Sequence, residues 1–200
     1  MASSQYPQLV AFDLDYTLWD LWIDTHVCGP LHRDGNRINE VLDRNNDSIS
    51  FYEDVPSILH ELKAEGVCIA ACSRTSAPDL AHQALRLLLI PQPPSPTVNG
   101  KYKSKDDEKP ISAIEIFDRL EIYPGSKLTH FKKLHRKTGL PYSEMLFFDD
   151  EHRNKEVGSL GVTFQLVSST GTTKKLFEQG LALWRKRNSE VQEDVSKDEE

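Results

Sequence analysis

The chain has 200 residues, 38% of them hydrophobic and 28% charged, which is typical of one globular domain large enough to bury a central sheet. Apolar runs fall short of the ~20 residues that a membrane-spanning helix needs. The net charge of −7 argues against a nucleic-acid groove, because neutralising phosphates requires a basic face. We therefore expect neither a membrane nor a nucleic acid as partner.

Short, nearly continuous apolar runs predict five buried strands, as in parallel sheets. In chain order they span residues 9–12, 67–72, 121–123, 145–148 and 162–167. Apolar residues at helical spacing lie between them, and Asp54 and Ser126 are candidate N-caps. This alternation predicts right-handed crossovers and a doubly wound, Rossmann-like α/β fold: a mainly parallel sheet of about five strands with helices on both faces.

The chain is expected to form one domain over residues 1–187. Residues 20–50 predict a small insertion after the first strand that could shade a site at the strand end. Residues 91–110 contain five prolines and predict a mobile loop. Residues 188–200, with six acidic residues and one lysine, predict a disordered tail.

The first eight residues, MASSQYPQ, have neither the basic start nor the apolar core of a secretory signal, and they lack the arginines of a transit peptide. We expect a cytoplasmic location, with the nucleus as the alternative. A monomer is the simpler expectation for the oligomeric state.

Polar residues follow the predicted strands at the carboxyl edge of the sheet, where doubly wound folds bind ligands. They are Asp13, Asp15 and Thr17 after the first strand, Ser73 and Arg74 after the second, Lys127 after the third, and Asp149 and Asp150 after the fourth. Carboxylates suit Mg²⁺, whereas serine, lysine and helix-opening amides suit a phosphate. A lysine at a helix N-terminus opposes the helix dipole, so helix stability does not explain it. The set predicts phosphoryl transfer.

The order DxDxT, serine, lysine and DD resembles the four motifs of the haloacid-dehalogenase (HAD) phosphatase superfamily. The strings FDLDYTLW, WIDTHV, CSRT, EIYPGSKLTHF and FFDDEHRN resemble its eukaryotic magnesium-dependent branch over residues 9–167. The resemblance implies a HAD-like fold in which the insertion at residues 20–50 replaces a large cap domain. It also implies Mg²⁺ as cofactor and phosphomonoester hydrolysis through an aspartyl-phosphate. It suggests two substrate classes, phosphotyrosine-type aryl phosphates and sugar adducts such as fructosamine 6-phosphates, carried on a phosphoprotein or a small molecule.

Carried over by residue, the resemblance makes Asp13 the nucleophile and Asp15 the general acid and base. Mg²⁺ would be held by Asp13, the backbone carbonyl of Asp15, and Asp149. Ser73 and Lys127 would hold phosphoryl oxygens, and Lys127 would also neutralise Asp13.

Five further residues complete the predicted site. Leu14 and Arg74 belong to the phosphate-binding set, although Arg74 could equally pair with a structural carboxylate. Thr17 is expected to hold the loop that orients the general acid. Asn154 could orient a carboxylate or the lysine of the site, or be exposed. If the strand pleat continues, Asp150 points away from the metal and binds it through water at most.

Two other functional classes remain open. The first is a phosphoryl-accepting receiver-like signalling domain, in which paired acids follow the first strand and the nucleophile follows the third; DxD after the first strand argues against it. The second is a catalytically silent binding protein on the HAD scaffold, which the complete set of essential side chains argues against.

Overall fold

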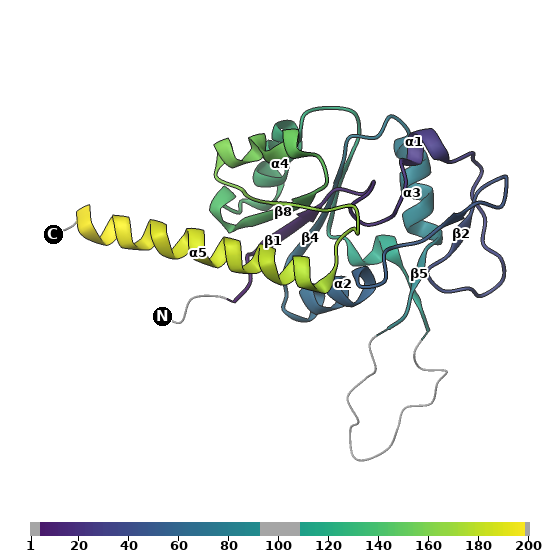
Figure 1. Ribbon diagram of the computed structural model, residues 1–200, viewed down its shortest axis with the longest axis horizontal. Helices are drawn as coiled ribbons and strands as arrows, with labels where there is room; N and C mark the ends of the chain where they lie inside the picture. The colour runs from purple at the N-terminus through teal and green to yellow at the C-terminus, as the bar shows by residue number, and fades with distance from the viewer. Residues whose placement is uncertain (1–4, 93–108, 199–200) are drawn as a thin grey trace, which may run out of the picture.

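The computed structural model describes residues 5–92 and 109–198. Its centre is a parallel sheet of five strands in the spatial order β7-β4-β1-β8-β9 (Figure 1). The strands are β1 (Leu9–Phe12), β4 (Cys68–Ser73), β7 (Arg119–Ile122), β8 (Met145–Asp149) and β9 (Thr163–Leu166). The predicted Rossmann-like α/β fold is confirmed, although β7 begins earlier than predicted.

The order of the strands determines where a ligand can bind. From β1 the chain moves outward to β4 and β7, and then crosses to β8 and β9 on the other side of β1. The direction of winding therefore reverses next to β1, and such a reversal opens a crevice at the carboxyl ends of the strands. The residues that follow β1, β4 and β8 meet at this crevice.

Helices cover both faces of the sheet. The helix α4 (Lys127–Thr138) and the 3₁₀ segment η4 (His152–Leu160) lie on one face, and α2 (Val55–Ala64) and α5 (Lys174–Asp198) lie on the other (Figure 1). Alternate side chains of β1 enter the two cores, because a strand presents successive residues to opposite faces. Its central position in a sheet covered on both sides explains the unbroken apolar run of this strand.

Of the two predicted N-cap residues, one caps its helix and the other does not. The Ser126 hydroxyl accepts a hydrogen bond from the Leu128 amide at 3.1 Å, as expected of an N-cap of α4. The prediction that Asp54 caps α2 is wrong, because its backbone is already helical and its side chain makes no cap bond there. Its carboxylate instead accepts from the amide of Lys174 at 2.8 Å, at the start of α5.

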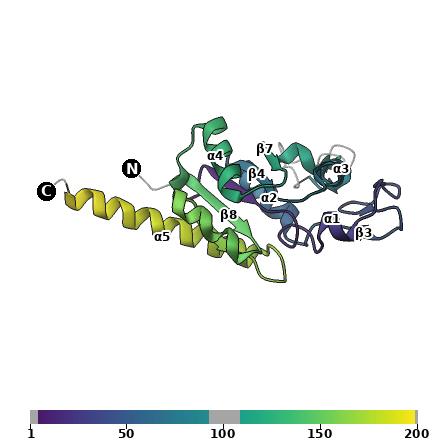
Figure 2. The same cartoon turned by 90° about the horizontal axis from the view of Figure 1, so that it is seen from above.

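The insertion after β1 forms a short helix and a hairpin. The helix is α1 (Ile23–His26), and the antiparallel pair is β2 (Val41–Leu42) with β3 (Ser48–Ile49). These elements lie at the end of the molecule opposite the C-terminus (Figure 2). On α1, Asp24 accepts hydrogen bonds from the amide and hydroxyl of Ser76 at 3.1 and 2.9 Å. The insertion is therefore bonded to the loop that follows β4 and borders the crevice.

The remaining elements flank the proline-rich segment and form the C-terminus. The helix α3 (Pro78–Leu87) leads to the antiparallel pair β5 (Leu89–Ile90) and β6 (Ile111–Ser112). The expected mobile loop lies mostly outside the described residues, since 93–108 are not described. Two 3₁₀ segments, η2 (Ala113–Ile116) and η3 (Tyr142–Glu144), were not predicted. Where disorder was expected after residue 187, α5 continues to Asp198; its glutamates, glutamine and lysine are good helix formers.

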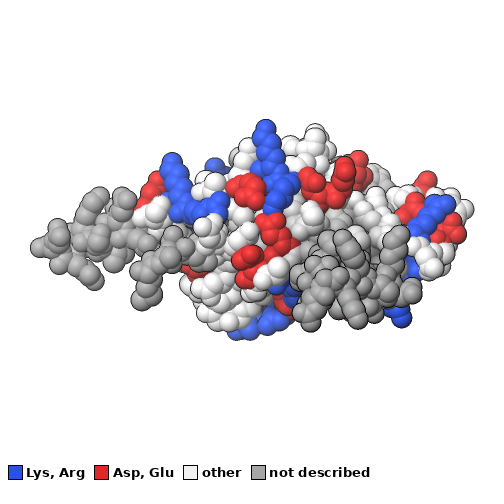
Figure 3. Space-filling model, turned by 90° about the horizontal axis from the view of Figure 1, so that it is seen from below, with Lys and Arg blue, Asp and Glu red and all other residues white. Residues whose placement is uncertain are grey.

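Acidic and basic side chains intermingle on the face seen in Figure 3, without a broad area of either sign. Among the described residues, no helix combines the length and apolarity needed to cross a bilayer. A phosphate-directed site must therefore be sought in the crevice rather than in a broad charged field on that face.

Candidate active site

The carboxyl ends of three neighbouring strands and the start of α4 surround one cavity of about 270 Å³. Its lining includes six residues predicted from the sequence, namely Asp13, Asp15, Ser73, Arg74, Lys127 and Asp150. The insertion contributes Trp22, Asp24 and Thr25 to the same cavity. The structure thus brings the sequence motifs together, with the insertion beside them.

Lys127 lies at the centre of this group. Its Nζ is 2.6 Å from Oδ1 of Asp13 and 3.1 Å from Oδ2 of Asp149, and it donates to the carbonyl of Cys72. Burial lowers the pKa of Lys127, but attraction from the two carboxylates outweighs burial, so its pKa is raised overall. A fully charged, 1% exposed ammonium at a helix N-terminus is therefore stabilised by its ion pairs and not by the helix.

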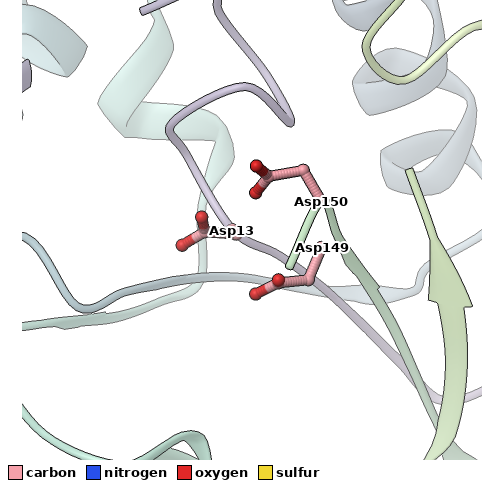
Figure 4. A group of neighbouring side chains, drawn as sticks. All are labelled: Asp13, Asp149 and Asp150. Atoms are coloured by element: carbon pink, nitrogen blue, oxygen red, sulfur yellow. The ribbon is translucent and has the colours of Figure 1, made fainter. Parts of the chain in front are cut away.

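Three carboxylates gather beside this lysine. Asp13, Asp149 and Asp150 each offer an oxygen within 4.8 Å of the others (Figure 4). The expectation that Asp150 points away is not met, because β8 ends at Asp149 and the strand pleat does not continue. Burial raises the pKa of Asp13 to about 8 despite the attraction of Lys127, and burial followed by repulsion from Asp149 raises that of Asp150 to about 6.

These carboxylates fit a hard divalent cation. When ionised they outnumber the Lys127 ammonium that they contact by two charges, so a bound divalent cation would offset their mutual repulsion. The side-chain atoms that could bind a metal here are all carboxylate oxygens, which is the ligand type that Mg²⁺ prefers. The residues present therefore suit the predicted Mg²⁺ site, with Asp150 closer to it than the sequence suggested.

Asp15 lies in a different environment from Asp13. Its Oδ1 accepts hydrogen bonds from Nε1 of Trp19 at 2.7 Å and from the amide of Ile23 at 3.3 Å. Burial raises the pKa of Asp15 to about 6, against the effect of the Trp19 bond. The sequence analysis did not predict the bond from Trp19. The tryptophan four residues after Asp15 was the available signal, since an indole N–H that becomes buried needs an acceptor.

The turn after β1 has an unusual backbone. Tyr16 has φ of 52°, a left-handed conformation that costs a non-glycine residue about 1–2 kcal/mol. The carbonyl of Leu14 accepts from the amides of Thr17 and Leu18 at 3.2 and 2.8 Å, which closes the turn. Leu14 contributes no side chain to the cavity, because its side chain is buried in the apolar core. The hydroxyl of Thr17, expected to hold this loop, has no hydrogen-bond partner among the described residues.

Asn154 connects two of the predicted residues. Its Nδ2 donates to both carboxylate oxygens of Asp149, at 2.9 Å each, and its Oδ1 accepts from Nη1 of Arg74 at 3.2 Å. Among the alternatives left open, Asn154 thus contacts the carboxylate. Arg74 bonds to this amide rather than to a structural carboxylate, and it also lines the cavity. Ser73 lines the cavity too, and its Oγ accepts from the amide of Thr75 at 3.2 Å.

Comparisons with known proteins agree with this arrangement. The family model described as Acid Phosphatase matches residues 5–187. A HAD-like hydrolase superfamily protein of Schizosaccharomyces pombe is 45% identical over 160 residues, covering 80% of this chain and 85% of that protein. Magnesium-dependent phosphatase 1 of Homo sapiens is 39% identical over 184 residues, covering 92% of this chain and 90% of the human protein.

A solved structure supports the fold independently. The N-terminal part of a Bacteroides fragilis protein, which contains a phosphatase domain and is complexed with Mg, superposes with a TM-score of 0.55 at 15% identity. The match covers 90% of this chain and 41% of that longer chain, and at this identity it shows the fold alone. By its sequence over nearly its whole length, this chain belongs to the acid phosphatase family within the haloacid-dehalogenase superfamily.

Proposed function

We propose that the chain is a Mg²⁺-dependent phosphomonoesterase that forms an aspartyl-phosphate on Asp13. Membership of the acid phosphatase family supports the reaction class, and the name of the human relative supports the metal. The observation that carries the proposal is the ammonium of Lys127 between Asp13 and Asp149, beside a cavity lined by Asp13, Lys127 and Asp150. With a divalent cation bound beside Lys127, the site would have the charge arrangement that phosphoryl transfer requires, namely cations around an ionised nucleophile.

Asp13 and Asp149 would hold the Mg²⁺, with Asp150 and the backbone carbonyl of Asp15 as further ligands. When bound, the ion supplies positive charge that keeps the carboxylates ionised and stabilises the phosphoryl oxygens. Lys127 and Ser73 line the same cavity and would bind the remaining phosphoryl oxygens. Arg74 would help to orient Asn154, to which it donates a hydrogen bond, and it could contact the outer side of the bound phosphate, since it lines the cavity.

The proposed reaction has two steps. First, a carboxylate oxygen of Asp13 attacks phosphorus, the ester P–O bond breaks, and Asp15 gives its proton to the leaving oxygen. Second, Asp15 takes a proton from a water molecule that attacks the aspartyl-phosphate, which releases inorganic phosphate and restores both carboxyl groups. The two hydrogen bonds to Asp15 both fall on Oδ1, so we assign the transferred proton to Oδ2.

The substrate class is proposed at a coarser level. The candidates are phosphotyrosine-type aryl phosphates and phosphorylated sugar adducts such as fructosamine 6-phosphates, which would enter past Trp22, Asp24 and Thr25 of the insertion in the cavity lining. A cytoplasmic location and a monomeric state accompany this proposal. A screen of phosphotyrosyl peptides and phosphorylated metabolites, ranked by kcat/KM, would separate the two classes.

Turnover of p-nitrophenyl phosphate tests the central proposal. It should require Mg²⁺ and should be lost in Asp13→Asn, while Asp34→Asn, which changes an exposed carboxylate of the insertion, should retain it. Turnover that persists in Asp13→Asn without metal would refute the assignment. Incorporation of one phosphoryl group without its release would instead favour a receiver-like signalling domain.

A further inference from the structure

The turn that carries Asp15 is bonded to a residue near the opposite end of the chain. Thr172 donates two hydrogen bonds to the carbonyl oxygen of Thr17, from its backbone amide at 3.1 Å and from its Oγ1 at 2.8 Å. The two residues are 155 positions apart, and both are fully buried. A peptide group whose carbonyl oxygen accepts two hydrogen bonds, and which is shielded from water, has little freedom to rotate.

This carbonyl lies next to a residue with an unfavourable backbone conformation, in a turn that is closed locally by hydrogen bonds to the carbonyl of Leu14. It follows Tyr16, whose φ of 52° is unfavourable for a large side chain. The hydroxyl of Thr17 cannot hold the turn, since it has no partner among residues 5–92 and 109–198. The bonds from Thr172 therefore supply a constraint that the local residues do not.

Thr172 is itself held on both sides. The preceding Gly171 has φ of 71°, and a Cβ there would lie 2.1 Å from the ring of Tyr52, so the loop packs closely against that ring. The amide of Tyr52 donates to the carbonyl of Leu18 at 2.9 Å, in the same turn. On the other side of Thr172, α5 begins at Lys174, whose amide is capped by Asp54. The donor is thus fixed relative to the turn and to the start of α2.

We propose that Thr172 is a positioning residue, which holds the turn between β1 and α1 so that the carboxyl group of Asp15 faces the cavity. Its hydroxyl and amide act on the carbonyl of Thr17, and neither touches the reacting atoms. The catalytic consequence rests on the proposed function, since it needs Asp15 as general acid; the effect on the turn does not. A displacement of about 1 Å at a catalytic group can cost roughly 100-fold in rate.

Thr172→Val removes the hydroxyl donor at constant shape, and Thr172→Ser restores it. Thr163→Val is the matched control, because the Thr163 hydroxyl is also buried but has no partner among the described residues. Hydrogen exchange of the Leu18 and Trp19 amides, followed by NMR, reports on the turn without requiring activity. Loss of one buried hydrogen bond should speed their exchange about two- to tenfold in Thr172→Val. The serine variant and the control should resemble the wild type.

Kinetics with Mg²⁺ and p-nitrophenyl phosphate measure the catalytic part. We expect kcat to fall about tenfold or more in Thr172→Val, with little change in KM, and to recover in Thr172→Ser. Unchanged exchange in Thr172→Val overturns the proposal, as does faster exchange with an unchanged kcat. If the wild type has no turnover, the proposed function fails, and exchange alone still decides whether Thr172 holds the turn. If the valine variant does not fold, Thr172→Ala is compared with Thr172→Ser in the same way.

Discussion

Replacing Asn154 by leucine should weaken Mg²⁺ binding while leaving the fold intact. The amide of Asn154 donates to both oxygens of Asp149 at 2.9 Å, and the side chain is 1% exposed, so water cannot replace it easily. Such outer-shell donors fix the orientation of a carboxylate that binds a metal. Leucine has a similar size and offers no donor.

Two effects of this change oppose each other. Without its donor, the oxygens of Asp149 are freer to contact a cation, which favours metal binding, but the carboxylate also loses its fixed orientation, which disfavours it. Lys127 lies 3.1 Å from Oδ2 of Asp149 and can attract the freed carboxylate away from the metal position. We therefore expect orientation to dominate. Hydrogen bonds to a charged group contribute about 1.5–3 kcal/mol, which corresponds to roughly a 10- to 100-fold loss of affinity.

Isothermal titration with Mg²⁺ and the dependence of kcat on Mg²⁺ concentration both measure this loss. Asn188→Leu is the matched control, because its amide on α5 bonds to the carbonyl of Ser143 at 3.4 Å, far from the site in the fold. A urea titration shows whether either variant has lost stability. An Asn154→Leu protein that binds Mg²⁺ as tightly as the control would show that Asp149 needs no orientation from this amide.

Three further outcomes follow from the same geometry. Lys127→Met should lower kcat by about 100-fold or more, and the unpaired buried Asp13 should lower the free energy of unfolding in urea by about 3–5 kcal/mol. Burial raises the pKa of Asp15 to about 6, so its acid form disappears as the pH rises through that value. The kcat for an alkyl phosphate should therefore fall above about pH 6. The kcat for p-nitrophenyl phosphate should fall less, because p-nitrophenolate is a better leaving group and depends less on protonation. Gly180→Ala should lower the urea midpoint, because a Cβ at this position would lie 2.5 Å from the Phe148 ring. Overpacking costs about 1–3 kcal/mol, which exceeds the gain of about 1 kcal/mol from the higher helix propensity of alanine. A raised midpoint would contradict this expectation.

Much of the sheet could be predicted because its inner strands β1, β4 and β8 are almost wholly buried. Such strands appear in the sequence as short continuous apolar runs, and the predicted runs agree with them, and also with the edge strand β9, to within one or two residues at each end. The error was larger at β7, an edge strand where Arg119 and Leu120 are only half-buried and apolar patterning is weaker. The β5–β6 pair was missed because two-residue strands show no periodicity.

The meeting of Asp13, Lys127 and Asp149 could also be predicted, since parallel strands end at one edge of a sheet. Their roles in catalysis stay predictions until variants are measured. The direction of Asp150 could not be predicted, because it depends on the residue at which β8 ends, and strand ends are the least certain feature of such an analysis.

Local conflict in the sequence explains why some functional residues were visible and others were not. Lys127 opposes its helix dipole, and Asp13 and Asp15 place like charges at a buried strand end; natural sequences keep such conflicts mainly where function requires them. Thr172 conflicts with nothing, because a threonine two residues before a helix is ordinary. Its partner is a backbone carbonyl 155 positions away, and a carbonyl is present in every residue, so no residue type marks it. Residues whose charge conflicts with their local position can therefore be found from the sequence. Residues that hold them in place can be identified only from the fold.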